Sequence, residues 1–256
     1  MENNGEVNKI LFHDSFQHMG SRVHIIEDNV PVEHQIEYLV YSYFFRGNRR
    51  KKLKEKDYKR CLEQLENVEI SVAEKKKILS MLAFSCEIRA YRLLEQYAQN
   101  PDEKLVHWAS MALIESRMAI ESELSDEKQI YISTGLGGKG EKLRLYALLL
   151  SALKKPFADY QKKVIEKEFD YFLSENDCEI ERLTIRDRYV ELVFLLPVAT
   201  DMRKMLDTAI LECNQYGNFL AKKYTLTNVK ELSQDEINQV LKSYRKQHNK
   251  TFDRLE

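Results

Sequence analysis

The spacing of apolar residues along the chain changes near Ser125. Before this point they recur every three or four positions, which is the pattern of amphipathic helices. After it, several short stretches alternate apolar and polar residues, which is typical of strands with one buried face. The pattern predicts an α+β, mostly helical protein with a helical domain over residues 1–124, irregular at its N-terminal end, and an α+β domain over residues 125–256.

The first half contains a series of helices. Proline suits the first turn of a helix, so Pro31 predicts a helix start, and Gly47-Asn48 predicts its end. Further helices are predicted over residues 54–67, from the Ser71/Glu74 capping box, over 86–98, and after Pro101. The apolar stripe expected to face the core on the first helix is Ile36, Leu39, Val40, Tyr43 and Phe44.

Residues 90–113 resemble a HEAT-type helical repeat. In that family a short Asn/Asp-Pro-Asp turn, here Asn100-Pro101-Asp102, joins two antiparallel helices, and small alanines such as Ala109 and Ala112 let helices pack closely. The resemblance covers one helix pair, and an ordinary helical hairpin gives the same pattern. It implies antiparallel helix pairs stacked into a surface that partners use.

The second half suggests an internal duplication. Residues 142–150 and 189–196 alternate as strands, and each is followed by a helical pattern, beginning near Pro156 and Asp201. With strands at 129–133 and 179–185, two ββα units over residues 129–173 and 179–220 would form a four-stranded antiparallel sheet with both helices on one face. A last helix is predicted from the Ser233/Glu236 capping box.

Composition limits the class of protein. Hydrophobic residues make up 43% of the chain and charged residues 32%, as in soluble globular proteins, and the net charge of −1 excludes a polycation as a whole. The start of the chain lacks the basic and apolar regions of a signal peptide, and the apolar runs are too short to span a bilayer. We therefore expect a cytoplasmic protein with no membrane partner. Its four cysteines lack metal-ligand spacing and are expected to be buried apolar residues: Cys61, Cys86, Cys178 and Cys213.

The glycine loop, Gly135-Leu-Gly-Gly-Lys-Gly140, satisfies the G-x-G-x-x-G pattern of dinucleotide-binding proteins. That fold needs a helix directly after the loop, whereas residues 142–150 alternate as a strand. A P-loop also fails, because no Ser or Thr follows Lys139. The loop is interpreted as a hairpin that needs glycines at positive φ, with no cofactor. The alternative is an anion or partner contact through Gly135, Gly137, Gly138, Lys139 and Gly140.

One segment of the chain is densely basic. Its candidate contacts for phosphates or for an acidic protein are Arg46, Arg49, Arg50, Lys51, Lys52 and Lys54. A solvated loop between helices is the simpler interpretation of the same charges. The aromatic residues Phe44, Phe45 and Tyr58 sit at helix-core spacing and do not interleave with the charges as in a single-strand binder.

No pattern of residues indicates catalysis. The histidines near the N-terminus, His13, His18, His24 and His34, match no metal-ligand spacing, and nucleophile motifs are missing. We therefore predict no catalytic residue and no metal site.

The favoured interpretation is a non-enzymatic protein–protein interaction or adaptor protein with an unknown protein partner. The alternative is a nucleic-acid or ribosome-associated protein that uses residues 46–56. A nucleotide- or small-molecule-binding enzyme that uses residues 135–140 is the weaker alternative, because no acid, base or metal set lies beside the glycines.

Overall fold

The computed structural model describes residues 22–46, 53–125, 129–153 and 155–252. The chain forms two compact units that meet between Glu141 and Lys142. We call them the helical unit and the sheet unit and describe each by itself. The sequence predicted a domain boundary after residue 124. In the structure, residues 125–141, which include β2 and the glycine loop, belong to the helical unit instead.

The helical unit contains five α-helices among its described residues. They are α1 (Val32–Arg46), α2 (Glu55–Glu66), α3 (Val72–Phe84), α4 (Ile88–Ala98) and α5 (Val106–Leu124), with a short 3-10 turn η1 (Glu103–Leu105) before α5. The core between them includes Leu82, Leu94, Trp108 and Ala112. Strand β1 (Arg22–Ile25) pairs in parallel with β2 (Gln129–Ile132), and the two-residue strand β3 (Gly138–Lys139) lies within the glycine loop.

Helix α1 buries the side opposite to the one predicted from its apolar stripe. The stripe points outward, with Ile36 57% exposed and Tyr43 74% exposed, while the inward face carries Gln35, Tyr38 and Ser42. The side chain of Phe44, also assigned to the stripe, lies outside the described residues. The polar face can be buried because its groups find partners. The Gln35 amide donates to the carbonyl oxygens of Val30 (2.6 Å) and Thr134 (3.2 Å), and the Tyr38 and Ser42 hydroxyls donate to the Glu115 carboxylate.

The sheet unit confirms the predicted α+β fold with a four-stranded antiparallel sheet. Its elements are β4 (Lys142–Ser151), α6 (Asp159–Glu175), β5 (Glu179–Ile185), β6 (Tyr189–Pro197), α7 (Met202–Gln215), β7 (Leu220–Thr227) and α8 (Gln234–Phe252). The strands lie in the order β5-β6-β4-β7, and all neighbours are antiparallel. The order β-α-β-β-α-β up to β7 is that of ferredoxin-like folds.

The duplicated unit differs in detail from the predicted ββα. Strand β2 pairs with β1 in the helical unit, and the fourth strand is β7, in a region predicted as helix up to Leu220. The two repeats are therefore β4-α6-β5 and β6-α7-β7. Helix α7 ends early because Gly217 (φ 132°) and Asn218 (φ 50°) reverse the chain. The Asn214 amide then holds the start of β7 by hydrogen bonds to the Leu220 N–H (2.8 Å) and carbonyl (2.9 Å).

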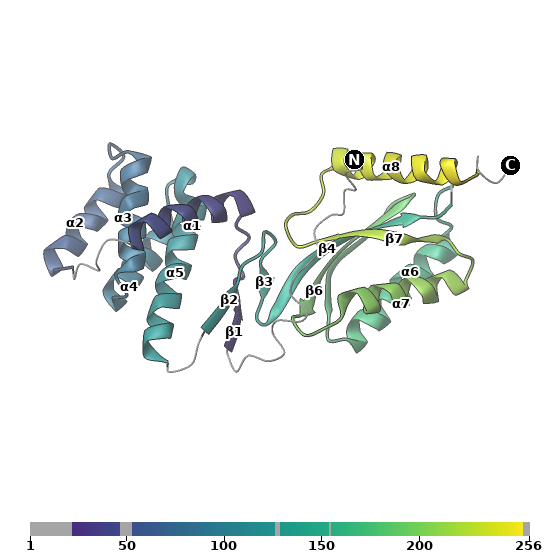
Figure 1. Ribbon diagram of the computed structural model, residues 1–256, viewed down its shortest axis with the longest axis horizontal. Coiled ribbons are helices and arrows are strands. Elements are labelled where there is room, and N and C mark those ends of the chain that lie inside the picture. The colour runs from purple at the N-terminus through teal and green to yellow at the C-terminus, as the bar shows by residue number, and fades with distance from the viewer. Residues whose placement is uncertain (1–21, 47–52, 126–128, 154, 253–256) are drawn as a thin grey trace. The chain divides into compact units, whose positions relative to one another are not determined.

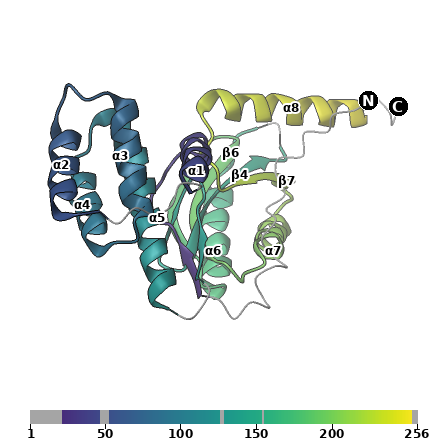
Figure 2. The same ribbon diagram turned by 60° about the vertical axis from the view of Figure 1, so that its left-hand side comes forward.

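Helices lie on both faces of this sheet. Helices α6 and α7 cover one face (Figure 1). The buried core of this unit includes Leu145, Phe169, Phe194 and Leu206. Helix α8 runs over the other face, as both views show (Figure 2), and its Ile237 is 2% exposed. Within the described ranges, no helix has both the length and the apolar character needed to span a bilayer.

Candidate nucleic-acid interface

The basic stretch, which we define as residues 46–60, is the densest local concentration of positive charge in the sequence. It holds nine Lys or Arg residues and two acidic residues, although the whole chain has a net charge of −1. The structure describes its second part, residues 53–60, including the exposed Lys54. Of the predicted contacts, Arg49, Arg50, Lys51, Lys52 and the side chain of Arg46 lie outside the described residues.

Helix α2 presents one basic face to solvent. Cys61 and Leu65 are buried, so they fix the inward side of the helix. Lys56, Lys59 and Arg60 are exposed, and their spacing of three and four residues places them on the same side of the helix. Lys59 and Arg60 lie beyond the basic run predicted from the sequence, which ends at residue 56. In the sequence, these two residues could have been recognised because they lie on the side of the helix away from its apolar positions.

The carboxylates of the basic stretch are both engaged within the protein. Glu55 forms an ion pair with Arg89 at the start of α4. Asp57 accepts a hydrogen bond of 2.8 Å from the backbone N–H of Lys54, which caps α2. For Lys56, Lys59 and Arg60, no ion pair is formed with any residue that the structure describes. A polyanion would therefore meet unneutralised cations here.

The basic residues of β4, unlike those of α2, are paired with carboxylates. Lys142 contacts Glu179 at 2.9 Å and Asp177 at 3.0 Å, and these hydrogen bonds raise the pKa of its ammonium group. Arg144 makes a two-pronged contact with Glu181. These carboxylates compete with phosphate for the cations, so this part of the sheet is the poorer polyanion surface.

The glycine loop packs closely against residues 26–35 of its own unit. Gly137 has a φ of 67°, and a Cβ atom there would lie 2.4 Å from the carbonyl oxygen of Glu27. The Gly137 N–H donates to the Thr134 carbonyl (3.1 Å), and the Gly140 N–H donates to the Glu27 carboxylate (2.8 Å). Two amides of the loop are therefore occupied by the protein.

The other loop residues divide by exposure. Gly135 and Gly138 are buried, whereas Lys139 and Gly140 are exposed. The glycines at 137 and 140 have positive φ, as a hairpin loop requires. The Glu27 carboxylate at the Gly140 amide is an unfavourable neighbour for a bound phosphate. Contact of this loop with a ligand or partner stays a prediction.

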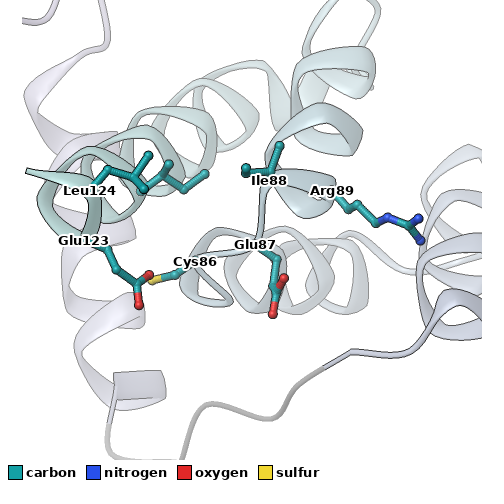
Figure 3. A pocket seen from close by; sticks show the side chains of 7 residues that line it. Cys86, Glu87, Ile88, Arg89, Glu123 and Leu124 are labelled. Carbon is teal, nitrogen blue, oxygen red and sulfur yellow. The ribbon is translucent and has the colours of Figure 1, made fainter.

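A pocket of about 290 Å³ lies between the start of α4 and the end of α5 (Figure 3). Cys86, whose φ is 56°, contributes a thiol, and Glu87 and Glu123 contribute carboxylates. Two carboxylates repel phosphate, so this pocket does not fit a nucleic-acid backbone. Its complete lining is Cys86, Glu87, Ile88, Arg89, Ile120, Glu123 and Leu124.

The structure describes only part of the histidine group near the N-terminus, for which no metal site was predicted. His13 and His18 lie outside the described residues. His34 of α1 stacks on His107 of α5, with ring centroids 4.7 Å apart. Burial, with a further contribution from His34, lowers the pKa of His107. No group of three metal-ligating side chains occurs among the described residues.

Comparisons with known proteins give only distant structural likenesses. No family model matches the chain, and no curated protein matches it. A protein assigned as a transposase, from Deinococcus radiodurans R1, has a TM-score of 0.34 and 16% identity over 43% of this chain and 94% of its own. A REP-associated tyrosine transposase bound to a REP hairpin has a TM-score of 0.32 and 10% identity over 48% of this chain and 68% of its own. No residue role is carried over at these TM-scores.

The comparison corrects the favoured interpretation from the sequence. The two solved structures named above are transposases, which disagrees with the prediction of a non-enzymatic protein–protein interaction or adaptor protein, and that prediction is not kept. The resemblance of residues 90–113 to HEAT-type repeats is matched by no family model and stays a prediction.

Proposed function

We propose that this protein binds nucleic acid and that the basic stretch supplies the main phosphate contacts. The observation that carries the proposal is the exposed face of α2, where Lys56, Lys59 and Arg60 lie together without a carboxylate partner among the described residues. Phosphate contacts of this kind release counterions, and they supply most of the affinity that does not depend on base sequence.

The local distribution of charge supports this assignment. Both carboxylates of the stretch are held by Arg89 and by the Lys54 backbone, so they do not neutralise the cations of α2. A second basic face lies on α8, where Lys242, Arg245 and Lys246 are exposed at helical spacing. Neutralising each face in turn decides which of them contacts the polyanion.

The test is binding to fluorescent single-stranded and hairpin oligonucleotides of about 20 nucleotides, followed by anisotropy at several salt concentrations between about 50 and 200 mM. One variant replaces Lys56, Lys59 and Arg60 by Gln, which retains helix propensity. The matched variant replaces Lys242, Arg245 and Lys246 by Gln, so it removes the same number of charges from α8. A third replaces Arg49, Arg50, Lys51 and Lys52 by Gln.

We expect the α2 and 49–52 variants to lose affinity for every oligonucleotide. The salt slope should fall by about one for each phosphate that the variant no longer neutralises. Their melting temperatures should stay close to that of the original protein, because exposed charges each contribute about 0–1 kcal/mol. The α8 variant should bind as the original does. Loss of binding in the α8 variant alone would move the interface to the sheet unit, and no binding by the original protein would overturn the proposal.

A further inference from the structure

Three cations lie at the end of the sheet where β4 leads into α6. We call them the hairpin patch and define it as Lys155, Arg186 and Arg188. The two arginines flank Asp187 at the tip of the β5–β6 hairpin, and Lys155 belongs to the connection between β4 and α6. Lys155 and Arg186 are exposed, and Arg188 is half-buried. None of the three forms an ion pair with a residue in the described ranges.

The tip of the hairpin has a fixed backbone. The Arg186 N–H donates to the Tyr189 carbonyl at 2.9 Å, which closes a two-residue turn. The carbonyl groups of both turn residues, Asp187 and Arg188, also accept hydrogen bonds from another segment of the chain. The turn therefore holds the backbone of the two arginines in place before any ligand binds.

The connection from β4 to α6 supplies these hydrogen bonds and is tied across the tip. At its start, the Ser151 N–H donates to the Arg188 carbonyl at 2.8 Å. Near its end, the Phe157 N–H donates to the Asp187 carbonyl, also at 2.8 Å, and the Phe157 side chain is only 4% exposed. Lys155 lies two residues before this anchor, so the hairpin patch joins cations from two segments that the backbone bonds hold together.

The hairpin patch keeps a positive charge. Its own acidic residue is Asp187, so three cations and one carboxylate leave a formal charge of +2. Asp159, at the start of α6, is paired with Lys162 at 3.4 Å. At the other end of β4, Lys142 and Arg144 are held by the carboxylates described above. A phosphate therefore meets less competition from carboxylates at the hairpin patch than at the start of β4.

We propose that the hairpin patch is a second phosphate-binding surface, and that nucleic acid contacts the sheet unit through it. This inference rests on the proposed function for the nucleic acid itself, but not on the assignment of α2 as its contact. The planar guanidinium of arginine binds two phosphate oxygens at once, and Lys155 adds a point charge. Because the backbone of the tip is already fixed, less conformational entropy is lost on binding. Phosphate contacts of this kind carry no information about base sequence.

The test uses the oligonucleotides and the salt concentrations of the binding experiment above. The hairpin variant replaces Lys155, Arg186 and Arg188 by Gln. The matched variant removes the same number of positive charges from exposed positions on α6 and α7 of the sheet unit, by replacing Lys163, Lys167 and Lys204 by Gln. Because both variants have the same net charge, a difference between them measures the local contact and not the charge of the whole protein.

We expect the hairpin variant to lose affinity for every oligonucleotide and the matched variant to bind as the original protein does. Between about 50 and 200 mM salt, the loss of affinity should become smaller by about 3- to 4-fold for each phosphate contact that the hairpin variant lacks. The melting temperatures of both variants should stay close to that of the original protein, because exposed charges contribute little to stability.

Two further measurements do not depend on the folding of the hairpin variant. Asp187→Asn removes the carboxylate from the patch and should strengthen binding by about 2- to 5-fold at low salt, because repulsion between exposed charges is about as strong as a surface ion pair. Acetylation of lysines in the original protein, followed by mass spectrometry, should show Lys155 protected by a bound oligonucleotide and Lys163 unprotected. Equal acetylation of Lys155 with and without the oligonucleotide would contradict the contact.

The outcomes separate this inference from the proposed function. If the hairpin variant binds as the matched variant does while the variant of Lys56, Lys59 and Arg60 loses affinity, the hairpin patch is overturned and the α2 interface stands. If only the hairpin variant loses affinity, the hairpin patch stands and α2 is not the contact. If the original protein binds no oligonucleotide, both proposals are overturned.

Discussion

The ammonium group of Lys75 lies 2.6 Å from the carboxylate of Asp102, and Lys75 is only 2% exposed. The pair joins the first turn of α3 to the Asn100-Pro101-Asp102 turn between α4 and α5. The backbone N–H of Asp102 also donates to the Tyr97 hydroxyl (3.3 Å), so the turn is held from two sides. The residues that suggested a repeat in the sequence therefore connect three helices of one core.

Removing the Asp102 carboxylate from this ion pair should lower the stability of the protein. Asp102→Ala leaves a buried ammonium without its partner, and we expect the free energy of unfolding to fall by about 2–3 kcal/mol, less than for a fully buried pair because Asp102 is partly exposed. Lys75→Met removes the charge and keeps the apolar stem, so it should cost less than about 1 kcal/mol. Urea unfolding measures both. Equal losses in the two variants would show that the buried charge is not the cause.

Two glycines of the glycine loop allow the cost of a steric clash to be separated from the cost of backbone strain. Gly137 and Gly140 both have positive φ, but a Cβ atom clashes with the Glu27 carbonyl only at Gly137. Gly140→Ala should cost about 1 kcal/mol from strain, whereas Gly137→Ala should cost at least about 2 kcal/mol more, because backbone atoms must move. Thermal unfolding of the two variants checks this order. Similar melting temperatures for the two variants would show that the backbone of residues 26–28 can move aside at little cost in free energy.

The stacked pair of His34 and His107 predicts a dependence of stability on pH. Burial lowers the pKa of His107 in the folded protein, so the unfolded chain binds the proton more tightly. Stability is then fully present above about pH 6.5, the ordinary pKa of histidine, and decreases as the pH falls from there toward the lowered pKa. Urea midpoints between about pH 7.5 and pH 5 should fall less for His107→Gln than for the original protein. Parallel pH profiles would contradict a role for His107.

The cysteines should differ in reactivity. Burial raises the pKa of Cys178 to about 11 and that of Cys213 to about 12, and it also raises the pKa of the buried Cys61. Thiolates react and thiols do not, so these three should be inert to a disulfide reagent near pH 8 in the folded protein. Cys86 is only partly buried and should react first. Cys86→Ser should abolish the fast phase, and a remaining fast phase would show that another thiol is accessible.

The sequence predicted those elements whose local signals agree with their packing. The alternation of residues 142–150 and 189–196 identified the paired central strands β4 and β6. The predicted capping box at Ser233 and Glu236 is confirmed in both directions, and at Ser71 the hydroxyl accepts from the Glu74 N–H as an N-cap does. Each of these signals involves residues close in sequence, so tertiary contacts were not needed to read them.

The features that could not be predicted depend on contacts between residues far apart in the sequence. The burial of Gln35, Tyr38 and Ser42 is possible only because Glu115 and the Thr134 carbonyl lie opposite them, and no local pattern shows this. Strand β7 is missed: the helix predicted from Asp201 extends to Leu220, and residues 221–227 are assigned to no element. The Gly217-Asn218 pair was the signal that could have ended the helix.

The parallel pairing of β1 with β2 has a consequence for how the helical unit opens. Arg22 is matched with Gln129, so this small sheet can form only when the chain that contains α1 to α5 has brought its two ends together. Closing such a long loop is entropically expensive, which places the pairing late in folding. The amide of Ile26, bonded to the Ile132 carbonyl at 2.9 Å, should therefore exchange its hydrogen with solvent only when the unit opens as a whole. Although it lies at the margin of the helices, this pair of strands would report the cooperative stability of everything between them.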